Sequence, residues 1–430
     1  MSKRNTLVKN IFSLSGIQVI NYIIPVLIVP YIVRIIGPSS YGLINFAQGI
    51  TAYFIIIVNY SYDLSATREV SLNRNNKDKL SEIFSSVLFS KIILFLVTSL
   101  IYFPLICLIP RLKTHFILFL FSYLIIVGNI LLPIWLFQGL EKLSRLSIFY
   151  FLVKLLYALL ILTLIRDAKD YILIPLILSI SQLVVGFTAF LYAIKIFKVS
   201  LIFINKNQIK KSLTNGWNLF LSSISTNIYA SSNIVILGLF SSNLNVGYFS
   251  AASKIIIVIQ SLLLVPMNQS FFPRISNLMN NKKEQGIIVL KNLTFFVGII
   301  MFFASLLIFL FSDIIINIVF GSKFIYASQT LKIMAFLPFV IGLNNVFGIQ
   351  GLINLKMDKQ FLIVTFVGAM ISIVLNLILV PIYFENGTAI SWLLTEIFIM
   401  VSFFITLRKN NILLFDWEYF KSYLTRLKEN

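Results

Sequence analysis

The chain has 430 residues, of which 59% are hydrophobic and only 12% are charged. A soluble domain is nearer one quarter charged and one half apolar, so the composition excludes a soluble enzyme and indicates a polytopic membrane protein. The formal net charge of +20 is also a property of nucleic-acid-binding proteins. However, apolar runs of about 20 residues recur along the chain, and each is long enough to cross a bilayer as a helix. We therefore expect an all-α membrane protein with no nucleic-acid partner.

Twelve apolar segments are predicted to span the membrane. In chain order they are 10–33, 41–63, 83–108, 115–139, 146–166, 171–194, 215–239, 247–272, 287–312, 328–353, 359–382 and 387–407. One set of alternate connections, with the two termini, carries 25 of the 35 basic residues, and the opposite set carries six. Because cytoplasmic loops are enriched in Lys and Arg, this asymmetry predicts that both termini are cytoplasmic.

Three pairs of short matching segments indicate an internal repeat. They are 41–47 with 246–252, 75–77 with 280–282, and 138–140 with 350–352. The pairs occur in the same order and at a nearly constant offset. Each half of the repeat holds an even number of predicted spans, so the halves enter the membrane from the same side. They should be related by a pseudo-twofold axis along the membrane normal.

The repeat predicts a division of the chain into two six-helix lobes. Residues 1–194 form the first lobe and residues 215–407 form the second, with a cytoplasmic linker at 195–214. The remaining segment, 408–430, combines aromatic and basic residues. Such a pattern predicts an amphipathic helix on the cytoplasmic surface, and a partly ordered tail is the alternative.

A lysine, Lys254, lies about two turns inside the predicted span that begins at residue 247. An ammonium group in hydrocarbon is costly and usually faces a bundle interior or a water-filled cavity. At 100° per residue, Ser250, Lys254, Ser261 and Asn268 share one helix face. We interpret this face as one wall of a hydrated cleft.

Three further spans carry a polar stripe. With the span that holds Lys254, they are the first two spans of each half of the repeat. The stripes are Ser15, Gln18, Tyr22 and Pro25; Asn45, Gln48, Asn59 and Asp63; and Asn218, Ser222, Ser225, Tyr229 and Asn233. Four stripes on equivalent helices predict a shared central cleft between the lobes. Hydrogen bonding between packed helices is the alternative reading of the same residues.

The other charged residues inside predicted spans have different expected roles. Lys154 lies in the middle of a span, which favours a cavity position, whereas Lys332 is close enough to a helix end to reach water. Arg34 ends the first span and is either a cleft residue or a boundary anchor. Buried carboxylates can exchange protons, so Glu396 and Asp63 are candidate coupling residues. Glu396 could equally be a neutral acid that is hydrogen-bonded to a neighbouring helix.

The sequence carries no recognisable catalytic constellation. The sequence has no P-loop. It has one cysteine, Cys107, and one histidine, His115, which argues against a Cys/His metal site. We therefore predict no catalytic residue, no metal and no cofactor. Cations attract phosphate, while amides, hydroxyls and tyrosines suit sugar hydroxyls. The predicted substrate-binding residues are Lys254, Lys154, Arg34, Asn45, Gln48, Asn218, Ser250 and Asn268.

Two segments resemble a known family. Residues 34–42, RIIGPSSYG, are similar to the R-x-x-G-x-x-x-Y-G segment between the first two spans of polysaccharide repeat-unit flippases. Residues 135–142, WLFQGLEK, are similar to the segment that closes the fourth span of these proteins. Asn376, Pro381 and Gly387 match the pattern near spans eleven and twelve. The resemblance covers nearly the whole chain and places it in the multidrug/oligosaccharidyl-lipid/polysaccharide exporter superfamily.

The resemblance implies two six-helix lobes around a cationic central cavity. It implies a monomer in the bacterial inner membrane that moves an undecaprenyl-pyrophosphate-linked oligosaccharide to the outer leaflet for O-antigen or capsule assembly. The implied mechanism is alternating access coupled to an ion gradient, and the implied partners are membrane lipid, a polysaccharide polymerase and a chain-length regulator. The positions of Lys254 and Lys154 are not part of the family motif, so their assignment as ligands rests on the polar stripes.

Three alternatives remain open at this stage. A drug/cation antiporter of the same superfamily would share the fold, although a cationic cleft disfavours cationic drugs. A peptidoglycan-precursor flippase is expected to have two additional spans. A polysaccharide polymerase or ligase would need a large outer loop, and the predicted outer loops are all short.

Overall fold

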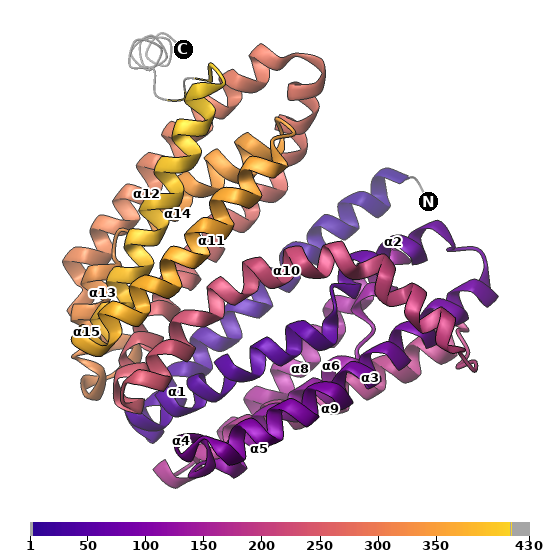
Figure 1. Cartoon of the computed structure of the whole chain (residues 1–430), viewed down its shortest axis with the longest axis horizontal. Coiled ribbons are helices and arrows are strands. Elements are labelled where there is room, and N and C mark those ends of the chain that lie inside the picture. Colours follow the sequence, from indigo (N-terminus) through magenta and orange to yellow (C-terminus); the bar gives the residue numbers. More distant parts are fainter. Residues whose placement is uncertain (1–2, 413, 415–430) are drawn as a thin grey trace. The chain divides into compact units, whose positions relative to one another are not determined.

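The computed structural model describes residues 3–412 and 414 (Figure 1). Over this part of the chain every secondary-structure element is a helix. Nine helical stretches within it are long and apolar enough to cross a membrane. The predicted all-α polytopic membrane protein is therefore confirmed, while the count of twelve spans stays a prediction. The predicted tail at 408–430 lies almost entirely outside the described residues.

The described chain divides into two compact units, Met1–Gly247 and Tyr248–Asn430. The helices of unit 1 are α1 (Lys3–Asn59), α2 (Tyr62–Leu72), α3 (Lys77–Leu108), α4 (Pro110–Lys113), α5 (Phe116–Tyr123), α6 (Ile125–Leu131), α7 (Ile134–Gly139), α8 (Leu143–Leu164), η1 (Ala168–Ile172), α9 (Leu173–Phe197) and α10 (Lys206–Phe240). Helix α11 (Asn243–Asn281) begins in unit 1 and continues in unit 2. The other helices of unit 2 are α12 (Lys283–Phe320), η2 (Ser322–Phe324), α13 (Ala327–Met334), α14 (Leu337–Asn344), η3 (Asn345–Ile353) and α15 (Asp358–Lys409).

The boundary between the units differs from the predicted linker at 195–214. The non-helical link between α9 and α10 covers only residues 198–205. Helix α10 packs against α1, α2 and α3, so it belongs to unit 1 although the sequence repeat assigns it to the second half. Small residues permit this packing: a Cβ atom at Gly238 would overlap the ring of Phe46. The six-plus-six division therefore stays a prediction from the repeat.

A break in α1 explains the glycines of the segment 34–42. Gly37 has φ 72° and ψ 175°, a conformation that glycine adopts without the steric cost of a Cβ atom. Beyond the break, a Cβ atom at Gly42 would overlap the carbonyl oxygen of Asn243, and one at Gly247 would overlap that of Pro38. Gly42 and Gly247 are equivalent positions of the sequence repeat. The repeated segments thus meet in unit 1 by close backbone packing.

Unit 2 is built around the contact of α11 and α12 with η3 and α15. Its core includes Leu290, Val346, Leu352 and Leu407, all of which are fully buried. Element η3 is a π-helix, a geometry that is rare and often occurs at functional sites. Helix α15 breaks at Phe384, which has φ 51° and ψ −126°. The break falls between the predicted spans 359–382 and 387–407.

The two arms of α15 are tied together by the residues that resemble the family pattern. Asn376 donates from Nδ2 to Ser391 Oγ over 2.8 Å, and both residues are fully buried. A Cβ atom at Gly387 would overlap the carbonyl oxygen of Leu379. The arms can therefore approach closely only because a small residue and a hydrogen bond lie at their contact.

Candidate functional site

Lys254 is a half-buried cation in the apolar part of α11. Among the described residues it has no hydrogen-bond or ion-pair partner. One turn earlier, Ser250 is buried, and its Oγ also lacks a partner in the described part of the chain. Buried polar groups are normally satisfied, so such exceptions indicate a place where water or a ligand binds. The role of Lys254 and Ser250 as substrate-binding residues therefore stays a prediction.

Asn268 lies further along α11 and is held within unit 2. Its Oδ1 accepts a hydrogen bond of 2.8 Å from Gln350 Nε2 in η3. Gln350 is fully buried and belongs to the repeated Gln-Gly-Leu segment. The matching glutamine of the first half, Gln138, accepts at Oε1 from Thr67 of α2 over 3.2 Å. In both halves this glutamine thus bonds a side chain of a preceding helix, which gives the repeat a physical role.

The predicted residues of α1 have separate surroundings. Asn45 donates to the carbonyl oxygen of Tyr41 in its own helix over 2.8 Å. Gln48 lines a mostly apolar cavity of about 180 Å³ that also involves Ser122 of α5 and Ser179 of α9. Arg34 is exposed at the end of the first arm of α1. A site shared by these three side chains stays a prediction.

The remaining predicted ligands are distributed over both units. Lys154 is half-buried on α8, which packs against α1 in unit 1. Asn218 lies on α10, but its side chain lies outside the part that the structure describes. Lys254, Ser250 and Asn268 belong to unit 2. A cleft shared by all these residues stays a prediction.

Glu396 accepts hydrogen bonds from two neutral donors. Its Oε2 accepts from Asn344 Nδ2 at 2.6 Å and its Oε1 accepts from Trp392 Nε1 at 3.2 Å. Asn344 is the last residue of α14, directly before the π-helix, and it also donates to the backbone oxygen of Glu396 over 3.0 Å. Glu396 is only 7% exposed. The hydrogen bond to a neighbouring helix, one of the two readings of this residue, is therefore present in the structure.

A buried lysine in unit 1 is a candidate that sequence reasoning did not weigh. Lys91 on α3 is 2% exposed, and its Nζ donates to Asn59 Oδ1 over 3.1 Å. It also interacts electrostatically with Asp63, the predicted coupling carboxylate. Between Asn59 and Asp63 the chain turns through two residues with left-handed φ, Tyr60 at 47° and Ser61 at 54°. The presence of Lys91 inside the predicted span 83–108 was the sequence signal that could have identified the cluster of Lys91, Asn59 and Asp63.

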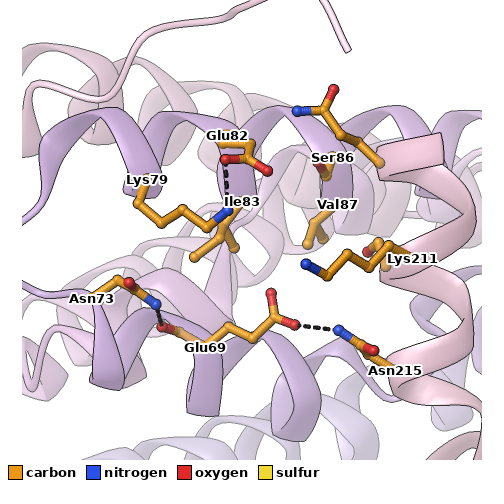
Figure 2. A pocket seen from close by; sticks show the side chains of 11 residues that line it. Glu69, Asn73, Lys79, Glu82, Ile83, Ser86, Val87, Lys211 and Asn215 are labelled. Atoms are coloured by element: carbon orange, nitrogen blue, oxygen red, sulfur yellow. Dashed lines mark hydrogen bonds and ion pairs between the residues drawn. The ribbon is translucent and has the colours of Figure 1, made fainter. Parts of the chain in front are cut away.

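A polar cavity of about 300 Å³ lies between α2, α3 and α10 (Figure 2). Its charged lining consists of Glu69 from α2, Lys79 and Glu82 from α3, and Lys211 from α10. The cavity is close to the ends of these helices, beside two connections of the set that carries 25 of the 35 basic residues. Within the described residues, no group of three or more His, Cys, Asp or Glu side chains could hold a metal ion.

The sequence model of a family described as "Polysaccharide biosynthesis protein" matches residues 7–279. The chain belongs to this family. Two curated relatives carry the name "Putative O-antigen transporter". The one from Escherichia coli (strain K12) is 31% identical over 405 residues, which cover 94% of this chain and 97% of the relative. The one from Shigella dysenteriae is 26% identical over 396 residues, with coverages of 91% and 98%.

Solved structures of two transporters share the fold of this chain. The lipid II flippase MurJ in its inward closed conformation has a TM-score of 0.68 at 14% identity. The alignment covers 93% of this chain and 87% of the MurJ chain. An inward-facing multidrug MATE transporter has a TM-score of 0.66 at 11% identity, with coverages of 88% and 95%. The family match and the relatives therefore confirm the predicted family, and the solved structures confirm the fold. These relatives and neighbours are transporters and flippases, not enzymes.

Proposed function

We propose that this protein is a flippase for lipid-linked oligosaccharide repeat units. In this proposal it moves an undecaprenyl-pyrophosphate-linked oligosaccharide from the cytoplasmic to the outer leaflet of the bacterial inner membrane, for O-antigen or capsule assembly. The names of the two relatives and the matching family support the transport of a polysaccharide precursor. The charge asymmetry of the loops supports cytoplasmic termini.

The observation that carries the proposal is the unpartnered ammonium of Lys254 within the described part of α11. A diphosphate linkage is the strongly anionic part of the proposed substrate, and Lys254 supplies a cation for it inside the apolar region. At an effective dielectric of about 20, two unit charges about 4 Å apart interact by roughly 4 kcal/mol before desolvation. A few lysines therefore suffice to attract the headgroup, yet still allow its release. Lys154 and Arg34 are the further proposed cations, and Asn45, Gln48, Asn218, Ser250 and Asn268 are proposed to contact the sugars.

Alternating access is proposed to be coupled to an ion gradient through Glu396 and Asp63. The two neutral donors of Glu396 can serve either its ionised or its protonated form with a small rearrangement. Asp63 interacts with Lys91 beside the α1–α2 break. We also propose that the polyprenyl tail stays in the bilayer during transport, because its transfer to water is costly. The proposed partners are a polysaccharide polymerase and a chain-length regulator, and the proposed transporter is a monomer.

Substitutions at Lys254 test the proposed function. Lys254→Arg keeps the positive charge and should retain export of surface polysaccharide in a strain that lacks the native copy. Lys254→Gln and Lys254→Glu should reduce export and leave lipid-linked repeat units in the inner leaflet, with Glu the more severe because it repels phosphate. Surface polysaccharide and lipid-linked intermediates would be measured at matched expression. Normal export by Lys254→Glu would exclude the phosphate-binding role.

A further inference from the structure

The cavity between α2, α3 and α10 is lined by both charged and apolar side chains (Figure 2). Ile83, Ser86 and Val87 line it from α3. The remaining lining residues are Glu69, Asn73, Lys79, Glu82, Gln208, Lys211, Ser212 and Asn215. All of them belong to unit 1. The cavity is therefore a self-contained feature of this unit.

Most of the polar groups in the cavity are already paired. Lys79 Nζ lies 2.7 Å from Glu82 Oε2, so this ion pair cancels one charge of each sign. Asn215 Nδ2 donates to Glu69 Oε1 over 2.9 Å. Asn73 Nδ2 donates to the backbone oxygen of Glu69 over 2.8 Å. The Asn215–Glu69 bond joins α10 to α2, whereas the other two contacts lie within α3 and at the end of α2.

Two charged groups in the cavity retain binding capacity. The ammonium of Lys211 extends from α10 into the cavity (Figure 2) and makes no hydrogen bond or ion pair with a described residue, although it interacts electrostatically with Glu82. Glu69 uses one carboxylate oxygen for Asn215, and its second oxygen has no donor among the described groups. A ligand that fits both must carry an anion for Lys211 and hydrogen-bond donors for Glu69.

We propose that this cavity is a loading site for the sugar phosphate part of the substrate. The phosphate would bind Lys211, and hydroxyl groups of the first sugar would donate to Glu69. A carboxylate is an acceptor that pairs well with hydroxyl donors, and an ammonium is a compact charge that suits phosphate. This inference rests on the proposed function, because it assumes that the cargo is a lipid-linked sugar.

The position of the cavity agrees with a loading role. Its walls come from the end of α2, the beginning of α3 and the beginning of α10. The connections next to these ends are those that the charge distribution predicts to be cytoplasmic. A substrate that is taken from the cytoplasmic leaflet would meet this end of unit 1 first. A phosphoethanolamine lipid headgroup offers a similar pair of groups, so the experiment must distinguish it from a sugar phosphate.

The test is a binding titration of the purified full-length protein in detergent with four probes: a hexose 1-phosphate, the free hexose, inorganic phosphate and glycerophosphoethanolamine. The variants are Lys211→Met and Glu69→Gln, with Lys210→Met as the matched control. Lys210 is the neighbouring lysine on α10 and does not line this cavity. The hexose 1-phosphate should bind more tightly than any other probe. Each cavity variant should weaken it about tenfold or more, as expected for a lost charge-assisted hydrogen bond, while Lys210→Met should not.

Several results would overturn the proposal. Equal hexose 1-phosphate affinity of Lys211→Met and the parent protein would show that Lys211 does not bind the phosphate. Binding of glycerophosphoethanolamine alone would identify a lipid headgroup site. Absence of hexose 1-phosphate binding would exclude the loading role. None of these results depends on export, so the failure of this inference is distinguishable from failure of the Lys254 substitutions.

Discussion

Lys91 and Lys254 are both lysines inside apolar helices, and the structure gives them opposite surroundings. Lys91 is almost completely buried and donates to Asn59. Lys254 is half-buried and has no partner among the described residues. A paired buried cation contributes to the native fold, whereas an unpaired one mainly costs desolvation free energy. We infer that Lys91 stabilises the packing around Asn59 and Asp63, and that Lys254 contributes to binding rather than to stability.

Methionine substitutions at these two lysines should therefore affect stability differently. Lys91→Met leaves Asn59 Oδ1 without its donor and Asp63 without its nearby cation, so it should lower the free energy of unfolding by about 1–3 kcal/mol. Lys254→Met should leave stability unchanged or raise it. Thermal unfolding of the purified proteins in one detergent would measure both. Equal destabilisation by the two substitutions would contradict the assignment.

Helix packing in unit 1 depends on close approach of α1 to the beginning of α11. The two repeat glycines, Gly42 and Gly247, leave no room for a Cβ atom because a backbone carbonyl lies at each site. Backbone cannot move aside as a flexible side chain can, so an added methyl group must displace a helix. The same reasoning applies to Gly387 at the contact between the two arms of α15. These glycines allow helices or helix arms to pack closely against one another.

Alanine substitutions provide a direct test of this packing. Gly42→Ala should destabilise the protein by about 1–3 kcal/mol or more, the range for overpacked sites. Gly298→Ala in α12 is the matched control, because its Cβ would lie 3.8 Å from Leu343 Cδ2, an ordinary contact. The yield of monodisperse protein and its thermal midpoint are the measurements. If Gly42→Ala had the same yield and thermal midpoint as Gly298→Ala, α1 and the beginning of α11 would not be in close contact.

The loop charges predict the orientation of the whole molecule in the membrane, and this orientation is testable without a substrate. Cys107 is exposed, so it would first be replaced by serine. A single cysteine would then be placed at Lys169, in an expected outer loop, or at Lys142, in an expected cytoplasmic loop; both residues are exposed. A membrane-impermeant thiol reagent added to spheroplasts should label Lys169→Cys, and it should label Lys142→Cys only after the membrane is opened. The reverse pattern would invert the predicted topology.

The all-helical membrane fold and the family could be predicted from the sequence, because both are encoded locally. Apolar runs of bilayer length require helices, since backbone groups in hydrocarbon must be hydrogen-bonded within the segment. The break at Gly37 and the arms of α15 likewise coincide with motifs that are visible in the chain. The candidate site was less predictable. Helical periodicity places Asn45, Gln48 and Asn59 on one face, but it does not show which neighbouring helix each of them meets.

Tertiary structure decided which polar side chains are already satisfied. Asn45 bonds its own helix and Asn59 bonds Lys91, whereas Lys254 has no partner among the described residues. It also brought α2, α3 and α10, which are far apart in sequence, around the cavity of Glu69 and Lys211. Such contacts join side chains that are far apart in the sequence; Glu69 and Asn215, for example, are separated by 146 positions. Local sequence patterns carry no information about these distances, so only the packed structure could reveal them.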